Sequence, residues 1–130
     1  MSHGQMKPLT ILVVDDEPLA RRRLLRLLAA MADAKVIGEA GNVQQARSLI
    51  TDLAPDVVLL DIQMPGGTGF DIIERVDGNT SAFIFVTAFD HYALRAFKAA
   101  AIDYLTKPIE PSRLQAAIDK ARPTIAARTS

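Results

Sequence analysis

Five polar residues of the chain stand at or just after the ends of short apolar runs. They are Asp15, Asp16, Asp61, Thr87 and Lys107. The runs before them are continuously hydrophobic, which is typical of buried parallel strands. Ligands in an open α/β sheet bind outside the carboxyl ends of the strands, so residues that are far apart in sequence can converge there. We therefore expect three carboxylates, a hydroxyl and an ammonium to share one pocket.

These residue types suit phosphoryl chemistry with a hard metal ion. Carboxylates within a few ångströms repel one another unless a cation is present, and oxygen ligands favour Mg²⁺. A carboxylate can act as a nucleophile toward phosphorus, while a metal, an ammonium and a hydroxyl stabilise the transferred group. Asp61, which stands alone after its run, is the better nucleophile candidate. The pair Asp15 and Asp16 is the better metal cradle.

The rest of the sequence alternates strand-like and helical segments, which indicates an α/β fold with a parallel sheet. The predicted strands are 9–14, a weaker 35–40, 57–60, 83–86 and 102–105. The predicted helices begin near Pro18, cover 42–53, 70–76 and 91–99, and begin again at Pro111. In the last helix, Leu114, Ala117, Ile118 and Ala121 form one apolar face.

A chain of 130 residues fits one domain. We place the domain at residues 9–122, after a disordered or added segment over 1–8. Because Pro123 ends or bends a helix, we expect 123–130 to be a tail or the start of a linker.

Composition narrows the classes of partner. Lys and Arg total 15 against 15 Asp and Glu, so no net positive field favours nucleic acid or an anionic membrane. There is no cysteine and no apolar run long enough to span a bilayer. We expect a cytoplasmic domain that binds neither nucleic acid nor membrane directly.

Several separated motifs closely resemble the receiver domain of two-component response regulators. They are Asp15-Asp16-Glu17, Asp61 with Met64-Pro65 and Gly69, Thr87-Ala88, and Lys107-Pro108 preceded by Tyr104. The resemblance covers about residues 9–122. It implies a flavodoxin-like fold, a doubly wound five-stranded parallel sheet of order 2-1-3-4-5 with five helices. The strand order is that of the chemotaxis receiver and is carried over by resemblance, since the pattern of apolar runs does not fix it.

The resemblance also implies a phosphoacceptor and a metal site. A sensor histidine kinase would donate a phosphoryl group to Asp61. Asp16, Asp61 and the Gln63 backbone carbonyl would ligate Mg²⁺, with Asp15 acting through water or as a supporting carboxylate. The chain would then be a signalling domain that assists its own phosphorylation and dephosphorylation, and not an enzyme in the usual sense.

Further residues receive roles from the same resemblance. Thr87, Ala88 and Lys107 would bind the phosphoryl group, Thr87 and Tyr104 would form the switch pair, and Pro108 would follow a cis peptide bond. Gln63 and Phe89 would line the approach of the water that hydrolyses the acyl phosphate and so control its lifetime.

The expected output is a changed protein surface. Phosphorylation would reshape the face formed by the fourth helix, fifth strand and fifth helix and favour a homodimer there. Residues 87–97 resemble receivers attached to LytTR-type DNA-binding domains, which suggests a transcriptional effector that is absent from these residues. Gly67-Thr68 departs from the family, which usually has a bulky apolar residue followed by Asp or Asn.

Two other functions fit the residues less well. A phosphatase of the haloacid-dehalogenase type needs a second acid two residues after the nucleophile, where this chain has Gln63. A phosphorylation-independent pseudo-receiver is disfavoured because every site position is filled. The basic run Arg21-Arg22-Arg23 with Arg26 is interpreted as a solvated helix face, and otherwise as a kinase or effector contact.

Overall fold

The computed structural model describes residues 7–75 and 81–129, which form a parallel five-stranded sheet. Its strands are β1 (Leu9–Val14), β2 (Ala34–Ala40), β3 (Val57–Leu60), β6 (Ala82–Thr87) and β7 (Asp103–Thr106). The order across the sheet is β2-β1-β3-β6-β7, and every neighbouring pair is parallel. The predicted flavodoxin-like fold and strand order are therefore confirmed. The central strands are entirely buried, as their unbroken apolar runs require.

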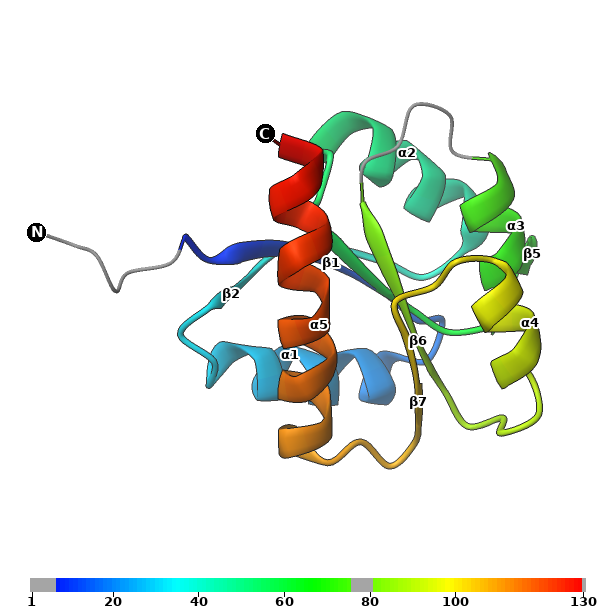
Figure 1. The fold of residues 1–130 in the computed structure, drawn as a ribbon. Coiled ribbons are helices and arrows are strands. Elements are labelled where there is room, and N and C mark those ends of the chain that lie inside the picture. The colour runs from blue at the N-terminus through cyan, green and yellow to red at the C-terminus, as the bar shows by residue number, and fades with distance from the viewer. Residues whose placement is uncertain (1–6, 76–80, 130) are drawn as a thin grey trace, which may run out of the picture.

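Helices cover both faces of the sheet (Figure 1). Helices α1 (Pro18–Ala29) and α5 (Pro111–Thr129) pack on one face around Leu24, Leu28, Leu114 and Ile118. Helices α2 (Val43–Leu53), α3 (Gly69–Arg75) and α4 (Ala93–Lys98) pack on the other. The predicted face of α5 is confirmed, because all four of its apolar residues are fully buried.

Local signals place the helix starts. Pro18 occupies the first turn of α1, where its missing N–H costs no hydrogen bond. The Asn42 side chain accepts a hydrogen bond from the Gln45 amide and caps α2. The predicted α4 was longer than the observed one; Ala100, at φ 63°, follows its end.

A small hairpin, which the sequence suggested only as a loop, precedes α3. Strands β4 (Gln63–Met64) and β5 (Gly67–Thr68) pair antiparallel. The Thr68 amide donates to Asp71 Oδ2 at 2.8 Å, and a Cβ at Gly67 would lie 2.5 Å from that oxygen. Gly67 also has φ +147°, so the departure from the family pattern fits a tight turn capped by Asp71.

The C-terminal segment is helical where it is described, which contradicts the expected tail. Helix α5 runs through Pro123 to Thr129 instead of giving way to a tail. Ile125 is only 8% exposed and packs on the core, and the Arg128 guanidinium donates to the Ser81 carbonyl at 2.6 Å. These contacts hold the last turns although proline cannot donate a helical hydrogen bond.

Other sequence expectations meet the limits of the described residues. Most of the expected loose segment over 1–8, and Val76 of the expected third helix, lie outside them. Within residues 7–75 and 81–129, no helix is both long and apolar enough to cross a membrane.

Asp103 links the edge strand β7 to α5. Its carboxylate accepts hydrogen bonds from both terminal nitrogens of Arg113, at 2.7 and 2.8 Å, and from Lys120 Nζ at 3.0 Å. Burial alone would raise the pKa of Asp103, but the hydrogen bonds from Arg113, the Tyr104 amide and Lys120 outweigh it and lower the pKa to about 2.

We predict that Asp103→Asn lowers the free energy of unfolding at pH 7 by about 1–2 kcal/mol. A folded-state pKa below the unfolded value stabilises the protein above about pH 4, and that contribution is lost as the pH falls toward 2. Urea unfolding of both proteins between pH 7 and pH 3 should show the difference shrinking with acid. Asp52→Asn, on the exposed side of α2, is the control. A difference that does not change with pH would contradict the assignment.

Candidate functional site

The predicted site residues meet at the carboxyl edge of the sheet. Asp15 follows β1, Asp61 follows β3, Thr87 ends β6, and Lys107 comes directly after β7. Lys107 Nζ donates to Asp15 Oδ2 at 2.7 Å and to Asp61 Oδ2 at 2.9 Å. Three different strands thus supply one triad of charges, as the topology predicts.

A cleft of about 550 Å³ opens over this triad. Its lining residues are Asp16, Glu17, Ala20, Asp61, Gln63, Met64, Pro65, Ala88, Phe89 and Lys107. Asp15 is 1% exposed and Thr87 is fully buried, and neither lines the cleft. The expectation of one shared pocket therefore needs a correction: Asp16, Asp61 and Lys107 line the cleft, while Asp15 and Thr87 support it from below. Burial of the strand ends accounts for this layering.

Charge balance in the triad depends on the lysine. Burial raises the pKa of Asp15. The hydrogen bonds from Lys107 and the Glu17 amide lower it, but they offset only part of the effect of burial. Burial alone would lower the pKa of Lys107, but its hydrogen bonds to Asp15 and Asp61 outweigh that and raise it. The ammonium therefore stays charged between two carboxylates.

Asp61 is held in place from several sides. Its backbone N–H donates to the Val14 carbonyl at 3.0 Å, and its Oδ1 accepts from the Ile62 amide at 2.6 Å. Gly69 passes so close that a Cβ there would collide with the Asp61 carbonyl oxygen and lie 2.9 Å from the Phe85 ring. Only glycine fits this approach.

The loop after β6 connects Thr87 with Tyr104. Thr87 Oγ1 accepts a hydrogen bond from the Phe89 amide at 3.3 Å, and the Tyr104 hydroxyl donates to the Phe89 carbonyl. Burial is the main cause that raises the pKa of Tyr104. The two residues predicted as a switch pair are thus joined through the backbone of one loop residue. The Lys107–Pro108 peptide bond is cis, as the resemblance implied.

The donor set of the cleft fits a hard cation that retains water ligands. Within the described residues, no three acidic or histidine side chains form a ligand cluster by themselves. Asp16 and Asp61 nevertheless line one cleft with Gln63, so carboxylate and carbonyl oxygens are available there. Mg²⁺ commonly uses one or two carboxylates and completes its shell with water and phosphate oxygens.

Two arginines of the basic run on α1 make hydrogen bonds to loop carbonyl oxygens. Arg21 Nη1 donates to the Asp15 carbonyl oxygen at 2.5 Å, and Arg23 Nη2 donates to the Ile109 carbonyl oxygen at 2.9 Å. Arg21 is half-buried, so a solvated helix face is wrong for that residue. Arg23 is exposed, as interpreted, although its guanidinium also binds a loop carbonyl. Helical periodicity gives no signal for such contacts, because they depend on which loops lie beside α1.

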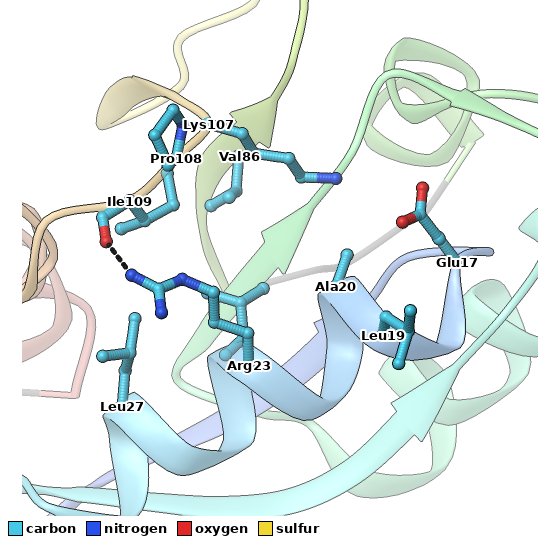
Figure 2. Close-up of a pocket in the computed structure, with 10 residues that line it drawn as sticks. Glu17, Leu19, Ala20, Arg23, Leu27, Val86, Lys107, Pro108 and Ile109 are labelled. Atoms are coloured by element: carbon cyan, nitrogen blue, oxygen red, sulfur yellow. Dashed lines mark hydrogen bonds between the residues drawn. The ribbon is translucent and has the colours of Figure 1, made fainter.

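A second, mainly apolar pocket of about 400 Å³ lies between α1 and the loop after β7. Figure 2 shows Leu19, Leu27, Val86 and Ile109 around it, with the Arg23–Ile109 hydrogen bond at one side. The side chain of Lys107 reaches past it (Figure 2).

Comparison with known proteins agrees with this geometry. A family model described as the response regulator receiver domain matches residues 11–119. An uncharacterized response regulatory protein of Vibrio vulnificus is 47% identical over 113 residues, which cover 86% of this chain and 47% of the relative. The transcriptional regulatory protein BtsR of Escherichia coli K12 is 42% identical with the same coverage. The chain spans about half the length of these curated relatives.

Solved structures show the same similarity. A two-component response regulator of the LuxR family from Aurantimonas sp. SI85-9A1 superposes with a TM-score of 0.81 at 29% identity, covering 93% of this chain and 87% of that one. The response regulator domain of Thermotoga maritima CheB superposes with a TM-score of 0.74 at 27% identity, covering 92% and 98%.

We predict that Gly69→Ala lowers the free energy of unfolding by about 1–3 kcal/mol, because the added methyl group would collide with the Asp61 carbonyl. Urea denaturation measures this. In the control Gly41→Ala the nearest atom to the new Cβ is 3.4 Å away, so a change within about 0.5 kcal/mol is expected. Equal losses in the two variants would contradict the close approach at Gly69.

Proposed function

This chain belongs to the response regulator receiver domain family, and we propose that it accepts a phosphoryl group from a sensor histidine kinase on Asp61. The observation that carries the proposal is the position of Asp61. It alone among the three aspartates both lines the cleft and accepts a hydrogen bond from Lys107. Asp15 is buried beneath the cleft, and Asp16 is exposed at its edge.

The chain's own groups divide the reaction between them. A carboxylate oxygen of Asp61 attacks phosphorus, the bond to the donor breaks, and the donor leaves with its electron pair. Lys107 offers an ammonium beside Asp61, where negative charge of the incoming group is stabilised without reorganisation. The same ammonium keeps Asp15 paired, so that the buried carboxylate does not face Asp61 without a counter-charge.

Magnesium is the cofactor that this donor set suits. Receiver domains generally bind Mg²⁺ at the phosphorylation site, and we propose Asp16, Asp61 and the Gln63 backbone carbonyl as its ligands, with Asp15 in support. When bound, the ion would neutralise charge on the phosphoryl oxygens. Ala88 lines the same cleft with a side chain small enough to leave room for the group.

The switch would act through the loop after β6. Thr87 lies beneath the cleft, and its hydroxyl accepts a hydrogen bond from the Phe89 amide, while the Phe89 carbonyl accepts one from the Tyr104 hydroxyl. A movement of Thr87 toward the phosphoryl group would therefore disturb both hydrogen bonds of Phe89. Tyr104 is already half-buried and bonded to the loop. We therefore propose that phosphorylation shifts the population of this loop arrangement, with Tyr104 following it.

The proposed output surface is the face of α4, β7 and α5. Leu94 is 67% exposed and Phe97 is 79% exposed on α4, next to the edge strand. Exposed apolar side chains of this size are common where a partner binds, and we propose a homodimer through this face.

Relatives named as transcriptional regulators support a transcriptional effector outside these residues, acting in the cytoplasm. The resemblance of residues 87–97 favours the LytTR type for that effector.

We predict that Asp61→Asn folds but no longer incorporates phosphate, because an amide cannot act as the nucleophile. Intact-protein mass spectrometry after incubation with acetyl phosphate and Mg²⁺ would show the mass of one phosphoryl group on the wild type only. Asp52→Asn should behave as wild type, and EDTA should suppress incorporation in both. Full phosphoryl incorporation in Asp61→Asn would contradict the assignment of Asp61 as the acceptor. No incorporation in the wild type would favour a pseudo-receiver.

A second prediction concerns the lifetime of the acyl phosphate. Phe89 lines the cleft, and its ring packs edge-on against His91 and Tyr92. We expect this apolar ring to hinder the attacking water, whereas the Gln63 amide could orient it. Phe89→Ala should therefore shorten the lifetime, measured as phosphate release from purified phosphoprotein in Mg²⁺ buffer. Leu53→Ala, far from the cleft on α2, is the control. Equal or slower decay in Phe89→Ala would mean that the ring does not shield the site.

A further inference from the structure

We propose that Arg21 and Arg23 of α1 are positioning residues for phosphoryl transfer, each holding one of the two loops that carry the charged groups. The inference rests on the proposed function above. It concerns a motif that the sequence suggested as solvated surface, and it assigns separate tasks to two residues of one arginine run.

Arg21 holds the loop with the acidic pair. Its Nη1 donates to the Asp15 carbonyl oxygen at 2.5 Å, and its Nε donates to Glu39 Oε1 on β2 at 3.2 Å. A Cβ at Gly41 would lie 3.4 Å from the same guanidinium, an ordinary van der Waals distance, so the arginine packs beside the residue that follows β2. The Arg21 side chain is only 23% exposed, which limits its freedom.

This contact acts on Asp16 through the backbone. The Asp15 carbonyl belongs to the peptide bond that joins Asp15 to Asp16, and a peptide is planar. On the other side of Asp15, the backbone amide donates to the Ala40 carbonyl at 3.0 Å. With both ends of Asp15 held, the direction in which Asp16 enters the cleft is set by the Arg21 hydrogen bond.

Arg23 holds the loop that carries the lysine. Its Nη2 donates to the Ile109 carbonyl oxygen at 2.9 Å, two residues after Lys107 (Figure 2). On the other side of that loop, the Lys107 amide donates to the Thr87 carbonyl at 2.8 Å. The lysine backbone is therefore fixed to β6 at one end and to α1 just beyond the proline.

Helical geometry explains why the two arginines serve different loops. Residues two apart on a helix point to nearly opposite sides of its axis. Arg21 reaches toward β2 and the acidic loop, and Arg23 reaches toward the loop after β7. Arg22, which lies between them, is exposed. It therefore provides an internal control of the same type and charge.

The test uses Arg21→Ala, Arg22→Ala and Arg23→Ala in two measurements. Isothermal titration gives the dissociation constant for Mg²⁺ alone. Intact-protein mass spectrometry gives the rate of phosphorylation by acetyl phosphate at saturating Mg²⁺. Arg21→Ala should weaken Mg²⁺ binding about tenfold, as loss of a group that orients a metal ligand does. Arg23→Ala should leave Mg²⁺ binding within about twofold and slow phosphorylation about tenfold, because the ammonium is misplaced.

A merely structural role would not make one variant lose Mg²⁺ affinity and the other lose phosphorylation rate. General destabilisation would weaken both properties together in each variant, and that result would overturn the proposal. The proposal would also be overturned if the wild type is active and all three variants have the same Mg²⁺ dissociation constant and phosphorylation rate. A wild type that neither binds Mg²⁺ nor takes up phosphate would instead reject the proposed function, and the positioning role with it.

Discussion

The contact on which the site depends is the hydrogen-bonded ammonium of Lys107 between Asp15 and Asp61. Parallel strands bring their ends together, so residues placed there for chemistry are crowded and largely buried. Two carboxylates in such a place would repel each other and lose hydration. One shared ammonium offsets both costs. The same ammonium stands where an incoming phosphoryl group would place its charge, so structural balance and proposed chemistry rely on one side chain.

The surrounding structure restrains this triad mainly through the backbone. Gly69 lets a helix start pass against the Asp61 carbonyl, and the Glu17 amide holds one oxygen of Asp15. Arginines of α1 bind carbonyl oxygens in the acidic loop and in the lysine loop. With the backbone held in this way, the Asp16 and Asp61 side chains line the cleft. The backbone contacts also tie the site to both layers of helices.

The site and the proposed output face share the loop that follows β6. Thr87 and Tyr104 both bond to Phe89, whose ring faces the cleft residues on one side and the start of α4 on the other. The ring centroid of Phe85 lies 6.3 Å from that of Tyr104 and 4.7 Å from that of Phe70. Arg95 Cζ of α4 lies 4.2 Å from the Phe70 centroid. Packed contacts therefore lead from the proposed switch residue Tyr104 to the helix with the exposed Leu94 and Phe97.

Much of this protein could be predicted from the sequence, because the deciding signals are local. Continuous apolar runs defined the buried strands, and polar residues at their ends marked the site. Family resemblance supplied the strand order, the expected roles of Gln63, Phe89 and Tyr104, and the cis peptide bond before Pro108. Tertiary structure decided the rest. Ile125 and Arg128 keep α5 helical past Pro123, because their core and Ser81 contacts come from distant residues. Burial separated Asp15 and Thr87 from the cleft. Arg21 and Arg23 donate hydrogen bonds to loop carbonyl oxygens, which helical periodicity could not predict. A helical pattern specifies which residues share a face, but not which loops the fold places against that face.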